Sequence, residues 1–365
     1  DKILYPSVGS GNAGGTKVYN FNFGQKSLSY TPPTGYVTLQ QDNLPETDKG
    51  ISGFSWIKSR DTASAHMLFD SSRGPQLRLK ADSTSSETTS QGTVTKFLKG
   101  GYAVGDQTAV NKSGDSVVSW NWVANGGTRE TNTNGSITSN VQANTTAGFS
   151  IVEYTATGSA STVGHGLSSA PETVWVKARS TDTADGFSIQ HVSTGTNFYD
   201  LSKTNASNSN TVVWNTIPTS TVFTIGTATG VNTSSATYIA YCWHGVEGFS
   251  KFGSYTGNAS SDGPFVYLGF RPACLIIKNA DRSVNWIIID SKRDPFNNGV
   301  SKYLIPNSTS TESQANNQGI ELLSNGFKIR QSSSNAFNAS SETHIYMAWA
   351  ENPFVGDGTN PVTAR

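Results

Sequence analysis

Short apolar runs separated by polar, turn-forming segments recur along most of the chain. Between Cys274 and Asp294, the apolar runs Cys274–Ile277 and Trp286–Ile289 flank the polar segment Asn279–Asn285. β-Branched runs of this length, bounded by turn residues, are typical of the two strands of a hairpin. The sequence shows no sustained helical periodicity, so the pattern predicts an all-β fold made of short antiparallel strands.

The hairpin layout occurs three times, which predicts three copies of one structural unit. In copies one and three the second strand ends in an Asp-Ser-x-Arg tetrad, at Asp70–Arg73 and at Asp290–Arg293. Each tetrad begins twelve residues after a lysine that ends the first strand. Copy two keeps the lysine but has Gln190 and His191 in place of the tetrad. The lysines that align the copies are Lys58, Lys177 and Lys278.

Further landmarks agree in order and spacing. In each copy an aromatic residue centres a strand, and 20, 20 and 22 residues later a closing strand ends in Trp. Copies two and three share an upstream strand that ends in Tyr-Thr, with 23 residues from that Tyr to the aligned lysine. Copy one lacks this strand and has Leu44-Pro45 instead. The shared residues are Tyr102, Phe223 and Phe327 in the aromatic strands, Trp122, Trp243 and Trp349 in the closing strands, and Tyr154-Thr155 and Tyr255-Thr256 in the upstream strands.

We therefore expect tandem antiparallel β-sandwich domains, as three related repeats of roughly 100 residues, which is a normal size for an all-β domain. A stretch rich in Gly, Thr and Asn is expected to link copies one and two flexibly, whereas Gly245–Gly253 joins copies two and three with almost no slack. The expected segments are 1–45 for a short N-terminal β segment, 46–125 for copy one, 126–147 for the linker, 148–247 for copy two, 248–354 for copy three and 355–365 for a C-terminal tail.

The composition agrees with a β-rich chain and narrows its partners. Charged residues make up 14% of the sequence, against roughly 25% in ordinary globular proteins. Ser, Thr, Asn and Gly supply the polarity instead, and these residues favour turns and loops. The formal net charge is +0 and there is no basic tail, so we expect no nucleic-acid partner. No apolar run reaches the ~18 residues of a membrane span, so we expect no membrane insertion.

The reactive residues do not form a recognisable catalytic or metal-binding pattern. Cys242 and Cys274 both fall in predicted strands, where small buried thiols are expected rather than a disulfide. The five histidines lack zinc-site spacing. A nucleophile elbow is missing and the carboxylates are scattered, so no acid pair stands out. We therefore expect no enzyme activity, no catalytic residues, no cofactor and no metal.

The repeated charged residues are interpreted as structural. In the Asp-Ser-x-Arg tetrads, the Asp is expected to accept turn N–H groups and to pair with the Arg. The three aligned lysines are expected to lay their stems over the sheet and to keep their ammonium groups in water. The residues assigned to this structural role in the tetrads are Asp70, Arg73, Asp290 and Arg293.

Two kinds of tryptophan can be distinguished. Trp122, Trp243 and Trp349 recur at one position of the repeat, so we expect them in the core. Trp214 has no counterpart in the other copies. Because exposed aromatic rings serve as stacking platforms for sugars, Trp214 and the nearby Tyr199 are the candidate ligand-binding residues.

Several phrases resemble virion structural and tail-fibre-type proteins of marine tailed phages, cyanophages in particular. Residues 21–46 resemble the end of a concanavalin-like, SPRY-type domain. The resemblance implies a location in the virion and brings no catalytic residues with it. The phrases that carry it are TGNASSDGPFVYLGFRPACLIIK (256–278), NWIIIDSKRDPFN (285–297), ELLSNGFKIR (321–330), IYMAWAENPF (345–354), GHGLSSAPETVWVK (164–177) and YIAYCWHGVEGFSKFGSYTG (238–257).

Three functional hypotheses follow from the repeats and this resemblance. The first is a non-enzymatic fibre or appendage of a phage particle, a homotrimer by analogy with fibres, that contacts other virion proteins and a glycan on the host surface. The second is a capsid-decoration or tail-linking protein that contacts only virion proteins. The third is a polysaccharide depolymerase, which would need clustered carboxylates in an exposed groove.

Overall fold

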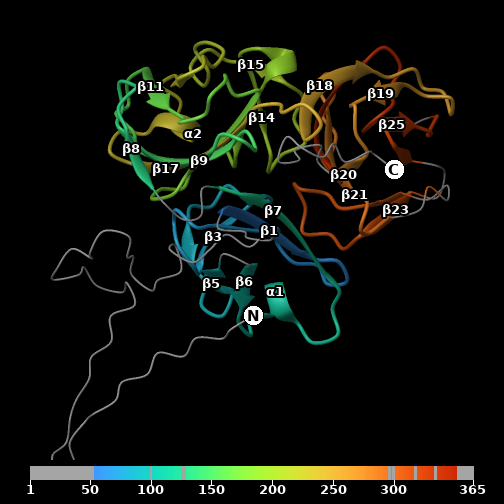
Figure 1. Cartoon of the computed structure of the whole chain (residues 1–365), viewed down its shortest axis with the longest axis horizontal. Helices are drawn as coiled ribbons and strands as arrows, with labels where there is room; N and C mark the ends of the chain where they lie inside the picture. Colours follow the sequence, from blue (N-terminus) through green and yellow to red (C-terminus); the bar gives the residue numbers. More distant parts are fainter. Residues whose placement is uncertain are drawn as a thin grey trace, which may run out of the picture. The chain divides into compact units, whose positions relative to one another are not determined.

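The computed structural model describes residues 53–98, 101–124, 129–294, 297, 301–315, 319–332 and 335–351 (Figure 1). Within these ranges the regular secondary structure is almost entirely antiparallel β-strand, which confirms the predicted fold class. Helix is limited there to the single turns α1 (Thr108–Asn111), α2 (Thr229–Asn232) and the 3-10 turn η2 (Val192–Thr194). The predicted segments 1–45 and 355–365 lie outside the described residues.

Each copy builds one main sheet around the predicted hairpin. The strand that carries the aligned lysine lies between the second hairpin strand and the closing strand that carries the Trp. These three strands are β1 (Gly53–Ser59), β2 (Met67–Asp70) and β7 (Val117–Val123) in copy one, β12 (Thr173–Ala178), β13 (Ser188–His191) and β17 (Thr237–Trp243) in copy two, and β20 (Pro272–Asn279), β21 (Ile287–Asp290) and β26 (Thr343–Ala350) in copy three.

Further strands extend the main sheets. The orders are β4-β3-β2-β1-β7 in copy one, β15-β14-β13-β12-β17-β10-β9-β8 in copy two and β18-β26-β20-β21 in copy three. The added strands are β3 (Leu77–Lys80), β4 (Thr88–Thr89), β8 (Glu130–Asn132), β9 (Ser139–Asn144), β10 (Phe149–Thr155), β14 (Asn197–Asp200), β15 (Asn208–Ser209) and β18 (Ser250–Thr256).

Small sheets cover the outer face of each main sheet. Their aromatic residues pack into separate outer cores, one in each copy. Each copy is therefore a sandwich of one large and one small layer. The small sheets consist of β5 (Val94–Leu98) and β6 (Gly101–Val104), of β11 (Ser161–Gly164) and β16 (Val222–Ile225), of β19 (Phe265–Tyr267), β24 (Ile320–Leu323) and β25 (Gly326–Ile329), and of β22 (Ser301–Tyr303) and β23 (Ser313–Ala315).

The strand registers make the three copies equivalent. One residue of the lysine strand pairs with the repeated Trp on one side and with the last residue of the hairpin on the other. These triplets are Trp122–Phe54–Asp70, Trp243–Thr173–His191 and Trp349–Cys274–Asp290. His191 therefore occupies the position of the tetrad Asp in copy two.

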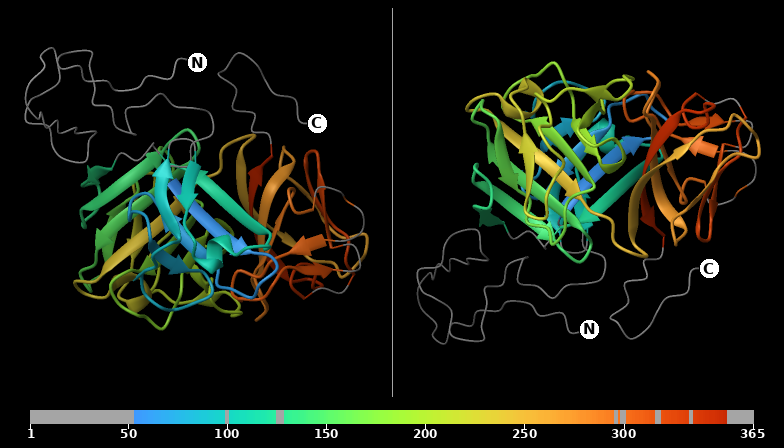
Figure 2. Two further views of the ribbon diagram at one scale, coloured as in Figure 1. Left: turned by 90° about the horizontal axis from the view of Figure 1, so that it is seen from below. Right: turned by 90° about the horizontal axis from the view of Figure 1, so that it is seen from above.

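The inner faces of all three main sheets pack on one shared hydrophobic core (Figure 2). Alternate residues of the three lysine strands, including Trp56, Trp175 and Ile276, are buried in it. The expectation of three sandwiches in series is corrected, because residues 46–365 form one compact unit. The lysine strands are apolar on both faces, and the other two copies cover the inner face of each.

The three repeated tryptophans lie in the core, as predicted, and they also contact one another there. The ring centroids lie 5.8 Å apart for Trp122 and Trp243, 5.0 Å for Trp122 and Trp349, and 6.1 Å for Trp243 and Trp349. The planes are inclined by 66° to 71°, the edge-to-face arrangement that aromatic rings prefer over a face-to-face sandwich. One residue from each copy thus makes a contact that no copy could make alone.

The predicted linker at 126–147 is wrong, because β8 and β9 lie in it. β9 pairs with β10 over six residues and so extends the sheet of copy two. Val141 and Gln142 are buried, whereas Asn140 is exposed. The Asn- and Thr-rich composition hid a strand near the edge of the sheet, where polar side chains can face water.

Replacing Trp243 by Ala should lower the free energy of unfolding by about 3–5 kcal/mol, because it leaves a cavity where all three copies meet. Urea unfolding followed by near-UV circular dichroism should still show one transition for all copies. The exposed Ile217→Ala variant is the control and should change stability little. Separate transitions for the copies would contradict a shared core.

Candidate functional site

The tetrad carboxylates join neighbouring copies as well as their own turns. Arg73 pairs with Asp70, and the Nε of Arg293 lies 2.5 Å from Asp290 Oδ2, which confirms the predicted pairs. The hydroxyl of Tyr241 in copy two donates to Asp70 at 2.7 Å. The indole N–H of Trp120 in copy one donates to Asp290 at 3.1 Å. Each Asp thus ties its hairpin to the closing strand of another copy.

His191 supplies the third link of this kind. Its Nδ1 accepts from the main-chain N–H of Ser193 at 3.2 Å, which leaves the proton on Nε2. Nε2 then donates to the carbonyl oxygen of Tyr346 in copy three, at 3.1 Å. Burial lowers the pKa of His191 to about 4, so the ring is neutral at pH 7. The three links run from copy one to two, two to three and three to one.

Two glutamates extend the charge pairs between copies. Burial raises the pKa of Glu312, but hydrogen bonds from Arg60 and Arg293 outweigh burial and lower it. Both glutamates bridge an arginine of their own copy and one of a neighbour. The distances are 2.9 Å for Glu87–Arg73, 3.0 Å for Glu87–Arg179, 3.0 Å for Glu312–Arg293 and 2.8 Å for Glu312–Arg60.

Replacing Asp70 by Asn should lower the free energy of unfolding by about 3–5 kcal/mol, because it leaves the buried guanidinium of Arg73 without its closest charge partner. Urea denaturation at pH 7 measures the loss. The control is Arg282→Gln, which breaks a pair with Glu342 whose arginine side chain is 47% exposed. Such a pair contributes less than about 1 kcal/mol. Equal losses in the two variants would contradict the structural role of the tetrad.

The prediction that the three aligned lysines keep their ammonium groups in water is wrong. Lys58, Lys177 and Lys278 are each at most 1% exposed. Lys278 Nζ donates to the carbonyls of Asn279 at 2.8 Å and Arg282 at 3.0 Å, within the hairpin turn. Turn carbonyls taken out of water need donors, and an ammonium group provides three. The equivalent bonds of Lys58 go to Ser59 O and Thr62 O, whereas Lys177 of copy two donates to Ser83 O of copy one.

Burial lowers the pKa of Lys278 to about 7 and that of Lys177 to about 8. Between these values and the unfolded pKa near 10.5, the unfolded state binds more protons than the folded state. The contribution of these lysines to the free energy of unfolding should therefore rise with pH from about 7 to 10. Below pH 7 their contribution should be flat.

Unfolding of the wild type and of Lys278→Met in urea at pH 7, 8 and 9 measures this effect. The variant should show a smaller rise of stability with pH than the wild type. Lys112→Met, which removes a lysine with a 44% exposed side chain, is the matched control and should leave the slope unchanged. Parallel curves for the wild type and Lys278→Met would contradict a buried ammonium group.

The candidate ligand residues Trp214 and Tyr199 are both fully buried, so the prediction of a surface contact is wrong. Trp214 belongs to the outer core of copy two. Tyr199 packs edge-to-face on Trp286, at 5.7 Å between centroids. Trp214 was predicted to be exposed because it has no counterpart in the other copies. It instead fills a part of the core that only copy two has.

Exposed aromatic residues lie instead on β19, where the sequence analysis did not place them. Phe265 is 45% and Tyr267 is 60% exposed, and the residue between them is buried. Lys251 Nζ lies 5.4 Å from the centroid of the Tyr267 ring. A polar hollow of about 780 Å³ beside them also contains Glu172 and Glu247. The in-out alternation of Phe265–Tyr267 was the signal that could have found this surface.

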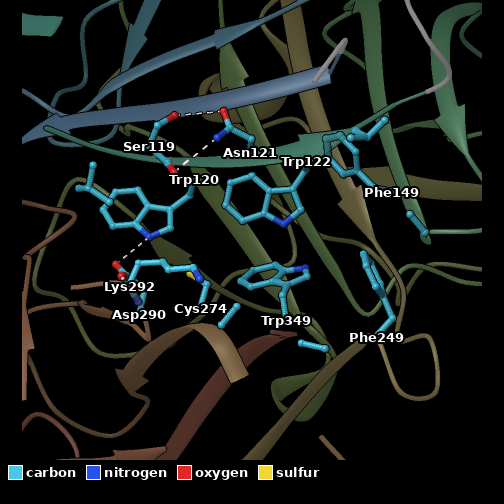
Figure 3. Close-up of a pocket in the computed structure, with 15 residues that line it drawn as sticks. Ser119, Trp120, Asn121, Trp122, Phe149, Phe249, Cys274, Asp290, Lys292 and Trp349 are labelled. Atoms are coloured by element: carbon cyan, nitrogen blue, oxygen red, sulfur yellow. Dashed lines mark hydrogen bonds between the residues drawn. The ribbon is translucent and has the colours of Figure 1, made fainter. Parts of the chain in front are cut away.

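A second hollow, of about 490 Å³ and mostly apolar, runs beside β7 (Figure 3). We call it the β7 groove, and residues 118–123 form one side of it. Trp349 lies opposite Trp122 in Figure 3, with Phe149 and Phe249 to one side of this pair. At the other end lie Cys274, Asp290 and Lys292. The groove therefore receives side chains from all three copies.

The groove lies along the edge of β7 that has no partner strand among the described residues. In copies two and three the upstream strands β10 and β18 pair along the outer edge of β17 and β26. Among the described residues, β7 pairs only with β1 and ends its sheet. The sequence signal for this site was the expectation that copy one lacks the upstream Tyr-Thr strand.

The free edge of β7 carries main-chain groups that can pair with another strand. Arg60 N–H donates to Ser116 O, so even-numbered residues of β7 bond to β1 and odd-numbered ones face the groove. Two of these carbonyls accept from side chains: Asn121 Nδ2 lies 3.4 Å from Ser119 O, and Asn144 Nδ2 lies 3.2 Å from Val123 O. Within the described ranges, the other main-chain groups of this edge pair with no strand.

Burial and hydrogen bonds constrain the reactive side chains at one end of the groove. Burial raises the pKa of Cys274 well above its usual value, which keeps the thiol protonated. Asp290 is held by Arg293 and Trp120. In the part of the chain that the structure describes, no three His, Cys, Asp or Glu residues come close enough to hold a metal ion.

Comparisons with known proteins give one match. Residues 47–353 match the model of a family described as a domain of unknown function, DUF7483. Neither the curated proteins nor the solved structures gave a match. Of the helices within the described ranges, none has the length and apolar character that crossing a membrane requires.

Proposed function

The chain belongs to the DUF7483 family, and we propose that it is a non-enzymatic structural component of a phage particle, of fibre or appendage type. The observation that best supports this is that the repeated charged residues have structural contacts. The tetrads and the three aligned lysines are buried and paired within or between copies. The charged side chains that could otherwise act in catalysis thus stabilise the packing of the three copies.

The resemblance to virion and tail-fibre-type proteins supports the same proposal. Its phrases overlap the strands that build the shared core: residues 256–278 include most of β20, and residues 345–354 include most of β26. A core that binds copies together suits a component under mechanical load. Assembly as a homotrimer is part of the proposal by analogy with fibres.

Contact with a glycan on the host surface is the second part of the proposal. The exposed aromatic residues on β19, beside a hollow with Glu172 and Glu247, support it. Exposed rings can stack on sugar faces, and carboxylates can accept hydrogen bonds from sugar hydroxyls. Weak sites of this kind gain avidity when several are held in one oligomer.

Antibody labelling of purified particles in the electron microscope tests the location, and we expect label on an appendage. The fluorescently tagged chain should also bind host cells. Tyr267→Ala should reduce this binding at least threefold, because it removes an exposed ring. Ile217→Ala removes an equally exposed side chain of copy two and should bind as the wild type does.

Other outcomes favour the alternatives. Label on the capsid together with no binding to cells would favour a decoration or tail-linking protein. Shortening of host polysaccharide by the purified chain would contradict a non-enzymatic role. A chain that is missing from particles would overturn the proposal.

A further inference from the structure

We propose that the polar hollow beside β19 binds a sugar with a free amino group, whose ammonium is attracted by two carboxylates and whose ring stacks on Tyr267. This inference rests on the proposed contact with a glycan and adds the chemical class of that glycan. We call the site the β19 hollow. Its charged lining side chains are Glu172, Glu247 and Lys251.

The β19 hollow is formed where copies two and three pack together. Glu172 directly precedes β12, and Glu247 lies between β17 and β18, so copy two supplies both carboxylates. Lys251 is the second residue of β18 and Tyr267 is the last residue of β19, so copy three supplies the ammonium group and the ring. The site therefore depends on the packing of the three copies in one body.

The carboxylate of Glu172 is particular to copy two. In each copy one residue directly precedes the residue that pairs with the closing Trp, and in copy two this residue is Glu172. Gly53 has the same place in copy one and Ala273 has it in copy three. The repeat thus builds its main sheets without a carboxylate at this position.

Lys251 and Tyr267 are particular to copy three in the same way. Lys251 directly follows the residue that pairs with the closing Trp, a place that Ser150 has in copy two. Tyr267 directly follows the residue that pairs with the repeated aromatic, a place that Gly164 has in copy two. Lys251 is half-buried, and Tyr267 is 60% exposed. Neither side chain is needed for the architecture, and both can be reached by a ligand.

The charges of the β19 hollow favour a cationic ligand. Glu172 Oε1 accepts from the main-chain N–H of Gly245 at 2.8 Å, which fixes the carboxylate. In the ranges that the structure describes, neither Glu172 nor Glu247 forms an ion pair. Lys251 Nζ donates to Tyr267 O at 2.9 Å. Two carboxylates thus face one ammonium group, and a concave site with an excess of one charge attracts the opposite charge.

The cation that fits this site is an organic ammonium group. Among the described residues, no three His, Cys, Asp or Glu side chains come close enough to hold a metal ion. An ammonium group has three N–H donors, which carboxylates can accept. A sugar adds a ring that can stack on Tyr267. The volume of about 780 Å³ also lies within the range of roughly 300–1,000 Å³ found for small-molecule sites.

Isothermal titration calorimetry of the full chain at pH 6 tests the class of sugar. The probes are a tetrasaccharide of β-1,4-linked glucosamine and its fully N-acetylated counterpart, which differ only in the charge and acetylation of the amino groups. The glucosamine form should bind at least tenfold more tightly, and its affinity should fall as the salt concentration rises. Tyr267→Ala should weaken binding of both probes, because it removes the stacking ring that they share.

Charge variants of the lining test the attraction directly. Glu172→Gln and Glu247→Gln should each weaken binding of the glucosamine form about threefold to tenfold, because each removes a negative charge and keeps the shape of the side chain. Lys251→Gln should strengthen it about twofold to threefold, because it removes a like charge and keeps a donor for Tyr267 O. Glu130→Gln, which changes an exposed glutamate of β8, is the matched control and should bind as the wild type does.

Three results would overturn the inference. The first is equal binding of the two tetrasaccharides, or no binding of the glucosamine form by the wild type. The second is unchanged binding by both Glu172→Gln and Glu247→Gln. The third is tighter binding of a tetralysine peptide than of the glucosamine form, since the ammonium group would then come from a protein.

Failure of this inference can be told apart from failure of the proposed function. If Tyr267→Ala lowers binding to host cells while the two tetrasaccharides bind equally, the amino-sugar inference is wrong and the glycan contact stands. If the glucosamine form binds as expected and the chain is missing from particles, the proposed function is wrong and the site stands.

Discussion

The contact among Trp122, Trp243 and Trp349 is the constraint on which the rest of the structure depends. Each ring presents an edge to the face of another, and each comes from a different copy. The inner face of every main sheet is apolar and would meet water if its neighbours were removed. Burial of that face is the dominant stabilising contribution, since apolar area removed from water contributes roughly 25 cal/mol per Å². The copies therefore fold as parts of one core.

Hydrogen bonds around this core fix how the three main sheets are oriented relative to one another. Asp70, His191 and Asp290 hold equivalent places, and each bonds to the closing strand of another copy. A neutral histidine can replace a carboxylate there because the partner is a carbonyl oxygen in place of a hydroxyl or an indole N–H. The residue type at the end of the hairpin thus differs between copies, but in each copy it bonds to the closing strand of another copy. Apolar packing alone would tolerate rotations of the sheets that these short, directional bonds exclude.

Much of the fold could be predicted from the sequence because it rests on local patterns. Runs such as Cys274–Ile277 specify strands by their own composition, and the repeated Trp indicated the core. Burial of Lys278 and Trp214 could not be predicted, because it depends on which surfaces meet after the copies assemble. The strand β9 was missed because its place next to the edge strand β8 tolerates polar residues. The β7 groove was visible only as a missing strand, and its walls come from copies distant in sequence.

The cyclic order of the links has a consequence for how such a protein can change in length. Open arrays of repeats can gain or lose single units at their ends, because each unit contacts only its neighbours. Here copy three bonds back to copy one through Trp120 and Asp290, which closes the circuit. A fourth unit inserted by duplication would find no vacant side of the core. During evolution such a chain can therefore grow only by duplication of all three copies together or by insertions in loops that take no part in the links between copies.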